Sequence, residues 1–148
     1  MSYVIDASVF NKMFLNEPDK DLARDLIKGL VKADKTMLAP SLLRLEIMKT
    51  ALHFGIAFSD IQALLKAHVD AGLVLIDPAD DVWTTAERIA TSGNAKAGYP
   101  ALEDSLYHAL AIHADGTFVT ADQRHVAKAK SFGHVALLSP DLLKSTFG

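Results

Sequence analysis

The chain has 148 residues, the length of one domain, and half of them are hydrophobic, which argues against intrinsic disorder. The absence of cysteine excludes disulfides and thiolate chemistry. The net charge of −3 is not that of a general nucleic-acid coat protein, although it leaves open an enzyme that binds divalent cations. No stretch resembles a signal peptide or a membrane helix, so we expect one soluble, cytoplasmic domain over residues 1–148, without membrane contact.

Short apolar runs alternate with longer stretches of helical pattern along the chain. In chain order, the predicted elements are strand Tyr3–Asp6, helix 21–31, strand Thr36–Ala39, helix 42–54, helix 61–71, strand Leu73–Ile76, helix 82–91, helix 102–114, strand Thr117–Thr120, helix 123–132, strand Val135–Leu138 and a short helix from Pro140. This alternation predicts a three-layer α/β/α sandwich with a mostly parallel sheet of about five strands.

Four acidic residues occupy notable places in this pattern. Asp6 ends the first strand, and Asp122 follows the fourth strand by two residues. Glu46 lies early in helix 42–54 among apolar residues, and Asp104 lies in the first turn of a strongly apolar helix. Because ligands bind at the carboxyl ends of strands in open parallel sheets, we expect the four carboxylates to converge at one edge of the sheet.

Such a cluster of carboxylates has an electrostatic cost. Two carboxylates ~4 Å apart repel by ~4 kcal/mol at an effective dielectric constant near 20. The cluster must therefore hold extra protons or bind a cation. Mg²⁺ and Mn²⁺ prefer oxygen ligands, whereas the lack of cysteine and of paired histidines makes zinc a poor candidate.

Each of the four acids also has an ordinary structural interpretation. The two that follow strands can be helix caps or turn formers. Asp104 can simply favour the positive end of a helix dipole. Glu46 can be an exposed helix residue that pairs with Lys49 or Thr50.

Four segments, YVIDASV, LAPSLLRLEI, YPALEDSLYHALA and FVTADQR, occur in this order. The ordered set resembles the PIN-domain family, in particular the small VapC-type toxins of bacterial and archaeal toxin–antitoxin pairs, over nearly the whole chain. The resemblance maps the acidic quartet of the family onto Asp6, Glu46, Asp104 and Asp122. It selects Asp104 over Glu103 because the small–large–small run at 109–111 follows the acid at the family's spacing.

The resemblance implies a metal-dependent phosphodiesterase. In such enzymes the carboxylates hold one or two Mg²⁺ or Mn²⁺ ions, which lower the pKa of a bound water for in-line attack. Glu46 would be a ligand or would orient the water. Ser8 and Thr120 match supporting positions, although Ser8 can also cap the first helix and Thr120 can be an ordinary strand residue.

Contact with the substrate is harder to assign. Gln123 and Arg124, which directly follow Asp122, are the first candidates. Further basic residues that follow or precede acidic segments are Lys12, Arg44, Lys49 and Lys96. Each of these cations, Arg124 included, is more simply a solvated surface charge. The histidines form no metal pair in sequence, with His125 and His134 isolated, and Trp83 and the phenylalanines are expected in the core.

The resulting hypothesis is a ribonuclease toxin that acts on RNA, is restrained by a cognate antitoxin protein and forms a homodimer. The main alternative is a catalytically weak module of the same fold that binds RNA or a protein. A third possibility is a different metal-dependent enzyme, a DNA nuclease or a small-molecule phosphatase. The chain has no phosphate-cradling glycine-rich loop to favour the third possibility.

Overall fold

The centre of the molecule is one all-parallel sheet of five strands in the order β3-β2-β1-β4-β5. The structure is a computed structural model and describes residues 1–148. The strands are β1 (Ser2–Ile5), β2 (Thr36–Pro40), β3 (Leu73–Ile76), β4 (Thr117–Thr120) and β5 (Val135–Leu137). Every predicted strand is present, with ends that agree to within one residue, because each one is a short run of mainly apolar residues between helical stretches.

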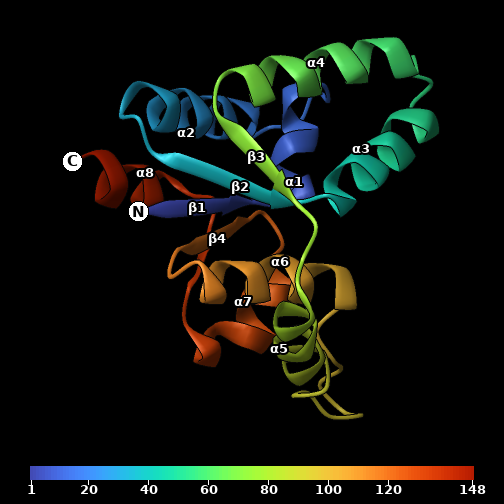
Figure 1. The fold of residues 1–148 in the computed structure, drawn as a ribbon, viewed down its shortest axis with the longest axis vertical. Helices are drawn as coiled ribbons and strands as arrows, with labels where there is room; N and C mark the ends of the chain where they lie inside the picture. The colour runs from blue at the N-terminus through green and yellow to red at the C-terminus, as the bar shows by residue number, and fades with distance from the viewer.

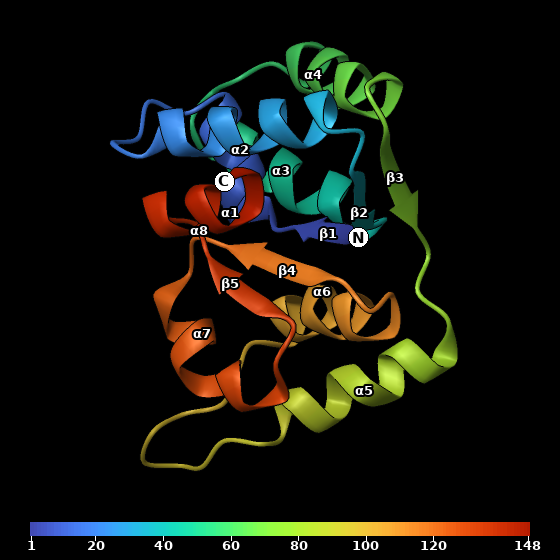
Figure 2. The same ribbon diagram turned by 90° about the vertical axis from the view of Figure 1, so that its left-hand side faces the viewer.

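Helices cover both faces of this sheet (Figures 1 and 2). One face carries α1 (Ala7–Phe10), η1 (Asn11–Met13), α2 (Lys20–Lys32), α3 (Leu42–His53), α4 (Phe58–Asp70) and α8 (Pro140–Phe147). The other face carries α5 (Asp80–Ala90), α6 (Leu102–His113), α7 (Gln123–Ala129) and η2 (Lys130–Phe132). The predicted three-layer α/β/α architecture is confirmed. None of these helices combines the length and apolar character needed to cross a membrane.

Three details of the predicted helices differ from the structure. Helix α4 begins at Phe58, after an extended Ala57, which is three residues before the predicted start at residue 61. The stretch 123–132 divides into α7 and the 3₁₀ turn η2, where the backbone tightens before Gly133. Helix α1 is too short, at four residues, to show a periodic pattern in the sequence.

The order in which the chain adds parallel strands to the sheet reverses between β1 and β4. From the central strand β1 it builds outward to β2 and β3, then crosses to the other side of β1 and adds β4 and β5. The backbone N–H of Asp6 donates to the carbonyl of Val119 at 3.0 Å, which holds the ends of β1 and β4 side by side. The carboxyl ends of two neighbouring strands at such a reversal form the usual crevice for ligands in open α/β sheets.

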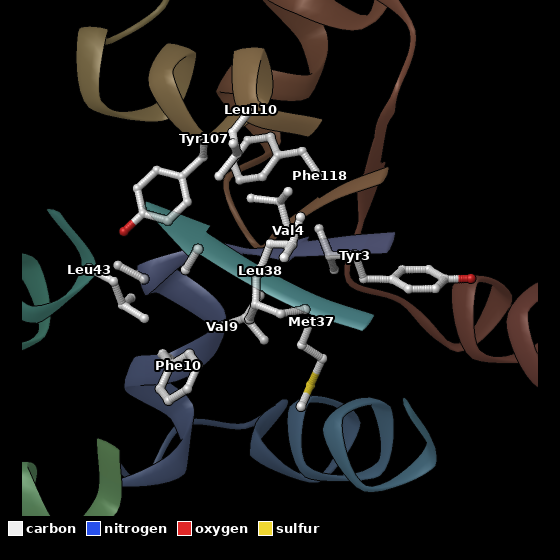
Figure 3. Packing of buried hydrophobic residues seen from close by; sticks show 14 of the residues in the cluster. Tyr3, Val4, Val9, Phe10, Met37, Leu38, Leu43, Tyr107, Leu110 and Phe118 are labelled. Atoms are coloured by element: carbon white, nitrogen blue, oxygen red, sulfur yellow. The ribbon is translucent and has the colours of Figure 1, made fainter. Parts of the chain in front are cut away.

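The buried hydrophobic side chains form one cluster around the sheet. Figure 3 shows Tyr107 and Phe118 above the sheet, and Phe10 and Met37 below it. The prediction that Trp83 belongs to the core is wrong, because its side chain is 44% exposed. Helix α5 buries a stripe at positions 82, 86 and 89, and Trp83 lies off that stripe.

The same prediction is wrong for three phenylalanines. Phe54 and Phe58 flank the turn between α3 and α4, and Phe147 ends α8 near the end of the chain. All three are at least 40% exposed. An end residue of a helix has fewer neighbours to cover it than a residue in a central turn, so its hydrophobicity alone does not predict burial.

Candidate metal site

An acidic cavity of about 260 Å³ lies at the carboxyl ends of β1 and β4. It is lined by all four predicted carboxylates: Asp6, Glu46, Asp104 and Asp122. The other lining residues are Ala7, Ser8, Asn11, Lys49 and Thr50. Four segments that are distant in the sequence thus contribute to one cavity. We refer to it below as the acidic cavity.

Asp6 forms the floor of the cavity and is 3% exposed. Its Oδ2 atom accepts hydrogen bonds from the hydroxyls of Ser8, at 2.6 Å, and Thr120, at 2.7 Å. Burial raises the pKa of Asp6, and these two hydrogen bonds act in the opposite direction. No side-chain donor is directed at Oδ1, which leaves that oxygen available for a ligand. Asp6 does not cap α1 with its side chain.

The same two hydroxyls hold the loop that carries Asp122. Ser8 Oγ accepts a hydrogen bond from the backbone N–H of Ala121 at 3.0 Å, and Thr120 Oγ1 accepts one from the N–H of Asp122 at 3.0 Å. Each hydroxyl therefore donates to Asp6 and accepts from the loop after β4. This double role fixes the position of the first acidic residue relative to the last one.

Asp104 lines the cavity, whereas its neighbour Glu103 is exposed outside it. Burial and the charges of the other three carboxylates raise the pKa of Asp104 from 3.8 to about 8. Without a cation, Asp104 therefore holds a proton at neutral pH. That proton relieves part of the repulsion expected for four neighbouring carboxylates.

Glu46 projects into the cavity from α3, and burial raises its pKa. Its Oε1 atom is buried without a hydrogen-bond partner, and so is the hydroxyl of Tyr107 on α6. The Tyr107 hydroxyl lies near Glu46 and lowers its pKa, which offsets part of the rise caused by burial. The two groups are not aligned as a hydrogen bond. The alternative pairing of Glu46 is not observed, because Lys49 makes no ion pair with it and Thr50 donates to its backbone carbonyl.

Asp122 both caps a helix and lines the acidic cavity. Its Oδ1 atom accepts a hydrogen bond from the backbone N–H of Arg124 at 2.9 Å, so it caps α7. The same side chain lines the acidic cavity. Because one oxygen is held by the helix, the carboxylate is fixed in orientation as well as in position.

The lining residues fit a hard divalent cation, although no group of three or more acidic or histidine side chains is already arranged around one ion position. Two residues that line the cavity, Glu46 and Asn11, each have a buried oxygen without a hydrogen-bond partner, Glu46 Oε1 and Asn11 Oδ1. Carboxylate and amide oxygens are the ligands that Mg²⁺ and Mn²⁺ prefer. Oxygens without a hydrogen-bond partner can also accept hydrogen bonds from the waters that these ions retain. Asn11 was missed by the sequence analysis, and only its position five residues after Asp6 links it to the site.

The first two candidates for substrate contact lie at the surface, outside the acidic cavity. Gln123 and Arg124 are exposed and do not line the acidic cavity. Lys49 does line it. The expectation of a solvated charge is wrong for Lys12, whose ammonium is buried and paired with Asp19 at 2.7 Å and more weakly with Glu17 at 3.4 Å.

The expectation that His125 is isolated is also wrong. His108 Nε2 lies 2.6 Å from the carbonyl oxygen of Gly133 and therefore carries the proton of that ring. His108 Nδ1 then accepts from His125 Nε2 at 3.0 Å, and both rings are buried. The pair joins α6 to α7, one helical turn beyond Asp104 and Asp122 respectively. Contact between helices that are distant in sequence gives no signal in the spacing of histidines.

The sequence model of the PIN domain matches residues 3–131, which is most of the chain and includes all four carboxylates. The chain belongs to the PIN-domain family. PIN domains are generally nucleases and typically depend on divalent metal ions.

Solved structures resemble this PIN domain in fold. VapBC2 from Rickettsia felis, bound to a DNA fragment from its promoter, matches with a TM-score of 0.66 and 18% identity over 93% of this chain and 97% of that one. A PilT N-terminus domain protein from the archaeon Sulfolobus solfataricus P2 matches with a TM-score of 0.56 and 18% identity over 99% and 94%. Comparison with curated protein sequences gives no match. At this identity, the two likenesses concern the fold.

Proposed function

We propose that this PIN domain is a metal-dependent endoribonuclease and the toxin of a VapBC-type toxin–antitoxin pair. The observation that carries the proposal is the acidic cavity, where four carboxylates meet, one of them with an unpaired buried oxygen, beside the unpaired amide oxygen of Asn11. Membership of the PIN-domain family supports the nuclease assignment. The likeness in fold to VapBC2 from Rickettsia felis, over 93% of this chain, supports the toxin assignment.

In this proposal, Asp6, Asp104 and Asp122 hold one or two Mg²⁺ or Mn²⁺ ions. When bound, a divalent cation supplies a water nucleophile near neutral pH and neutralises charge on the phosphodiester. Ser8 and Thr120 act as positioning residues, because their hydroxyls fix the orientation of the Asp6 carboxylate. Glu46 acts as a further ligand or orients the attacking water.

Cleavage of total cellular RNA by the purified protein tests the enzyme assignment. We expect fragments in Mg²⁺ or Mn²⁺ and none in EDTA. Asp104→Asn should lose cleavage, whereas Glu103→Gln, which changes the exposed neighbouring acid, should retain it. A well-folded protein, free of bound partner, that cuts no RNA with either metal would refute the nuclease and favour a module that only binds RNA or a protein. Parallel assays with DNA and a phosphomonoester separate the remaining enzyme classes.

The toxin assignment needs a separate test in cells. Expression of the wild-type chain alone should arrest growth, and Asp104→Asn should not. Co-expression with a protein encoded beside it should restore growth and should yield a stable complex on purification. Light scattering of the purified chain tests the predicted homodimer. RNA cleavage in vitro without growth arrest would keep the nuclease and remove the toxin.

A further inference from the structure

A second cavity, of about 480 Å³, lies between α7 and the loop that joins α5 to α6. Figure 2 shows this loop running beneath α7. The cavity wall includes small loop residues and two cationic side chains of α7, Arg124 and Lys128. We refer to it as the basic pocket.

The loop side of the basic pocket has a defined structure. Asn94 Oδ1 accepts hydrogen bonds from the backbone N–H groups of Lys96, at 3.0 Å, and Ala97, at 2.8 Å. Residues 94 and 98 also pair as an antiparallel bridge. A Cβ atom on Gly93 would lie 2.1 Å from the carbonyl oxygen of Gly98, so the backbone is packed as closely as only glycine permits. The wall is thus built from the backbone of a closed turn.

The helix side of the pocket carries uncompensated positive charge. Arg124 and Lys128 are four residues apart on α7 and therefore share one face of the helix. Neither takes part in an ion pair, and no acidic residue lines the pocket. The Lys128 ammonium donates to the carbonyl of Tyr99 at 3.3 Å, which holds it at the pocket wall, and the Arg124 side chain makes no hydrogen bond. A guanidinium and an ammonium in this arrangement favour a phosphate group.

The two cavities are neighbours along the chain. Asp122 lines the acidic cavity, and Arg124, whose backbone N–H donates to Asp122, lines the basic pocket. A ligand that engages both must carry phosphates in series, as a polynucleotide strand does. Basic grooves that track a strand by its phosphates are typical of proteins that bind single-stranded nucleic acid.

We infer that the basic pocket binds a backbone phosphate of single-stranded RNA that flanks the phosphodiester held at the acidic cavity. This inference rests on the proposed function for the identity of the polymer. It makes the protein an enzyme for chains rather than for dinucleotides, because a dinucleotide has one internal phosphate and cannot occupy both positions.

Binding of fluorescently labelled RNA, followed by anisotropy in EDTA so that no cleavage occurs, tests the pocket. The variant is Arg124→Ala with Lys128→Ala. Its matched control is Lys28→Ala with Lys32→Ala, which removes the same charge at the same spacing from α2 on the opposite face of the sheet. For a 12-nucleotide single strand, we expect the pocket variant to bind about tenfold more weakly than the control variant.

Two further readouts separate a phosphate contact from general charge loss. The slope of log affinity against log salt should fall by roughly 0.7 in the pocket variant, because that is the contribution of one neutralised phosphate in a single strand. Arg124→Gln, which removes a side chain without hydrogen bonds, should give about half of the change in slope in a protein with unchanged thermal stability.

Equal affinities and equal salt slopes for the pocket and control variants would overturn the inference. So would a loss confined to the affinity for a co-purified protein partner, because that result would assign the pocket to the partner. Wild-type protein that binds RNA through these two cations but never cleaves it would sustain the pocket and refute the proposed function.

Discussion

Replacement of Asp104 by asparagine should stabilise the metal-free protein while abolishing its activity. The pKa of Asp104 is raised from 3.8 to about 8, so the folded state holds this proton more tightly than the unfolded chain does. The resulting contribution to stability is complete below about pH 4 and is lost as the pH rises through about 8. Asparagine has no such proton, and its stability should not show this loss.

The size of the effect follows from the pKa. A rise from 3.8 to about 8 corresponds to about 6 kcal/mol if every part of it appears as stability. Asp104 is only partly buried and water screens it, so we expect about 2–3 kcal/mol. In urea unfolding with EDTA, the stability of Asp104→Asn relative to wild type should therefore increase by that amount between pH 4 and pH 9.

Two comparisons make this prediction decisive. Glu103→Gln should show no such change with pH, because Glu103 lies outside the cavity. Addition of Mn²⁺ at pH 8 should stabilise the wild type and leave Asp104→Asn nearly unaffected, because a ligand stabilises only the state that binds it. If Asp104→Asn kept a constant offset from wild type across the pH range, the assignment of the raised pKa to this carboxylate would be wrong.

Three further predictions follow from contacts around the site. Thr120→Val removes a donor to Asp6 and should lower the free energy of unfolding by about 1–3 kcal/mol in urea, whereas Thr120→Ser should retain most of it. Burial and the neighbouring His108 lower the pKa of His125 to about 4, so the stability of the wild type should fall as the pH falls from about 6.5 towards 4. The double variant His108→Phe and His125→Leu should lack this loss when thermal unfolding is followed against pH. Parallel pH curves for the two proteins would contradict the prediction. Gly93→Ala should speed hydrogen exchange in residues 92–98, because its Cβ atom would clash with the carbonyl oxygen of Gly98. Exchange of the sheet amides should stay unchanged and serves as the internal control. Unchanged exchange in the loop would count against a closed turn.

The sheet and its acidic edge were predictable because their signals are local. Each strand is a brief apolar run, and the acids at 6 and 122 stand directly at or after strand ends. The rule that parallel strands present their carboxyl ends at one edge then brings these two acids together. Glu46 and Asp104 lie on helices, and the choice of Asp104 over Glu103 came from the family pattern, since the helix is apolar on several sides.

The contacts that complete the site were not predictable from one sequence. Asn11 meets the cavity only because α1 and η1 return along α3, where its amide donates to Thr50. Tyr107 resembles any apolar residue of α6 until the fold places its hydroxyl near Glu46. The basic pocket likewise requires α7 and a loop about 30 residues earlier to lie side by side. Such pairings depend on three-dimensional packing and leave no periodic trace in the sequence.

The acidic cavity takes two of its carboxylates from residues before the 92–98 loop and two from residues after it. A nascent chain therefore lacks a complete site until residue 122 has left the ribosome. The same division makes the loop a natural place to split the protein. Two fragments separated there would each hold two of the four carboxylates, and under the proposed function restored cleavage would report that the halves had reassembled.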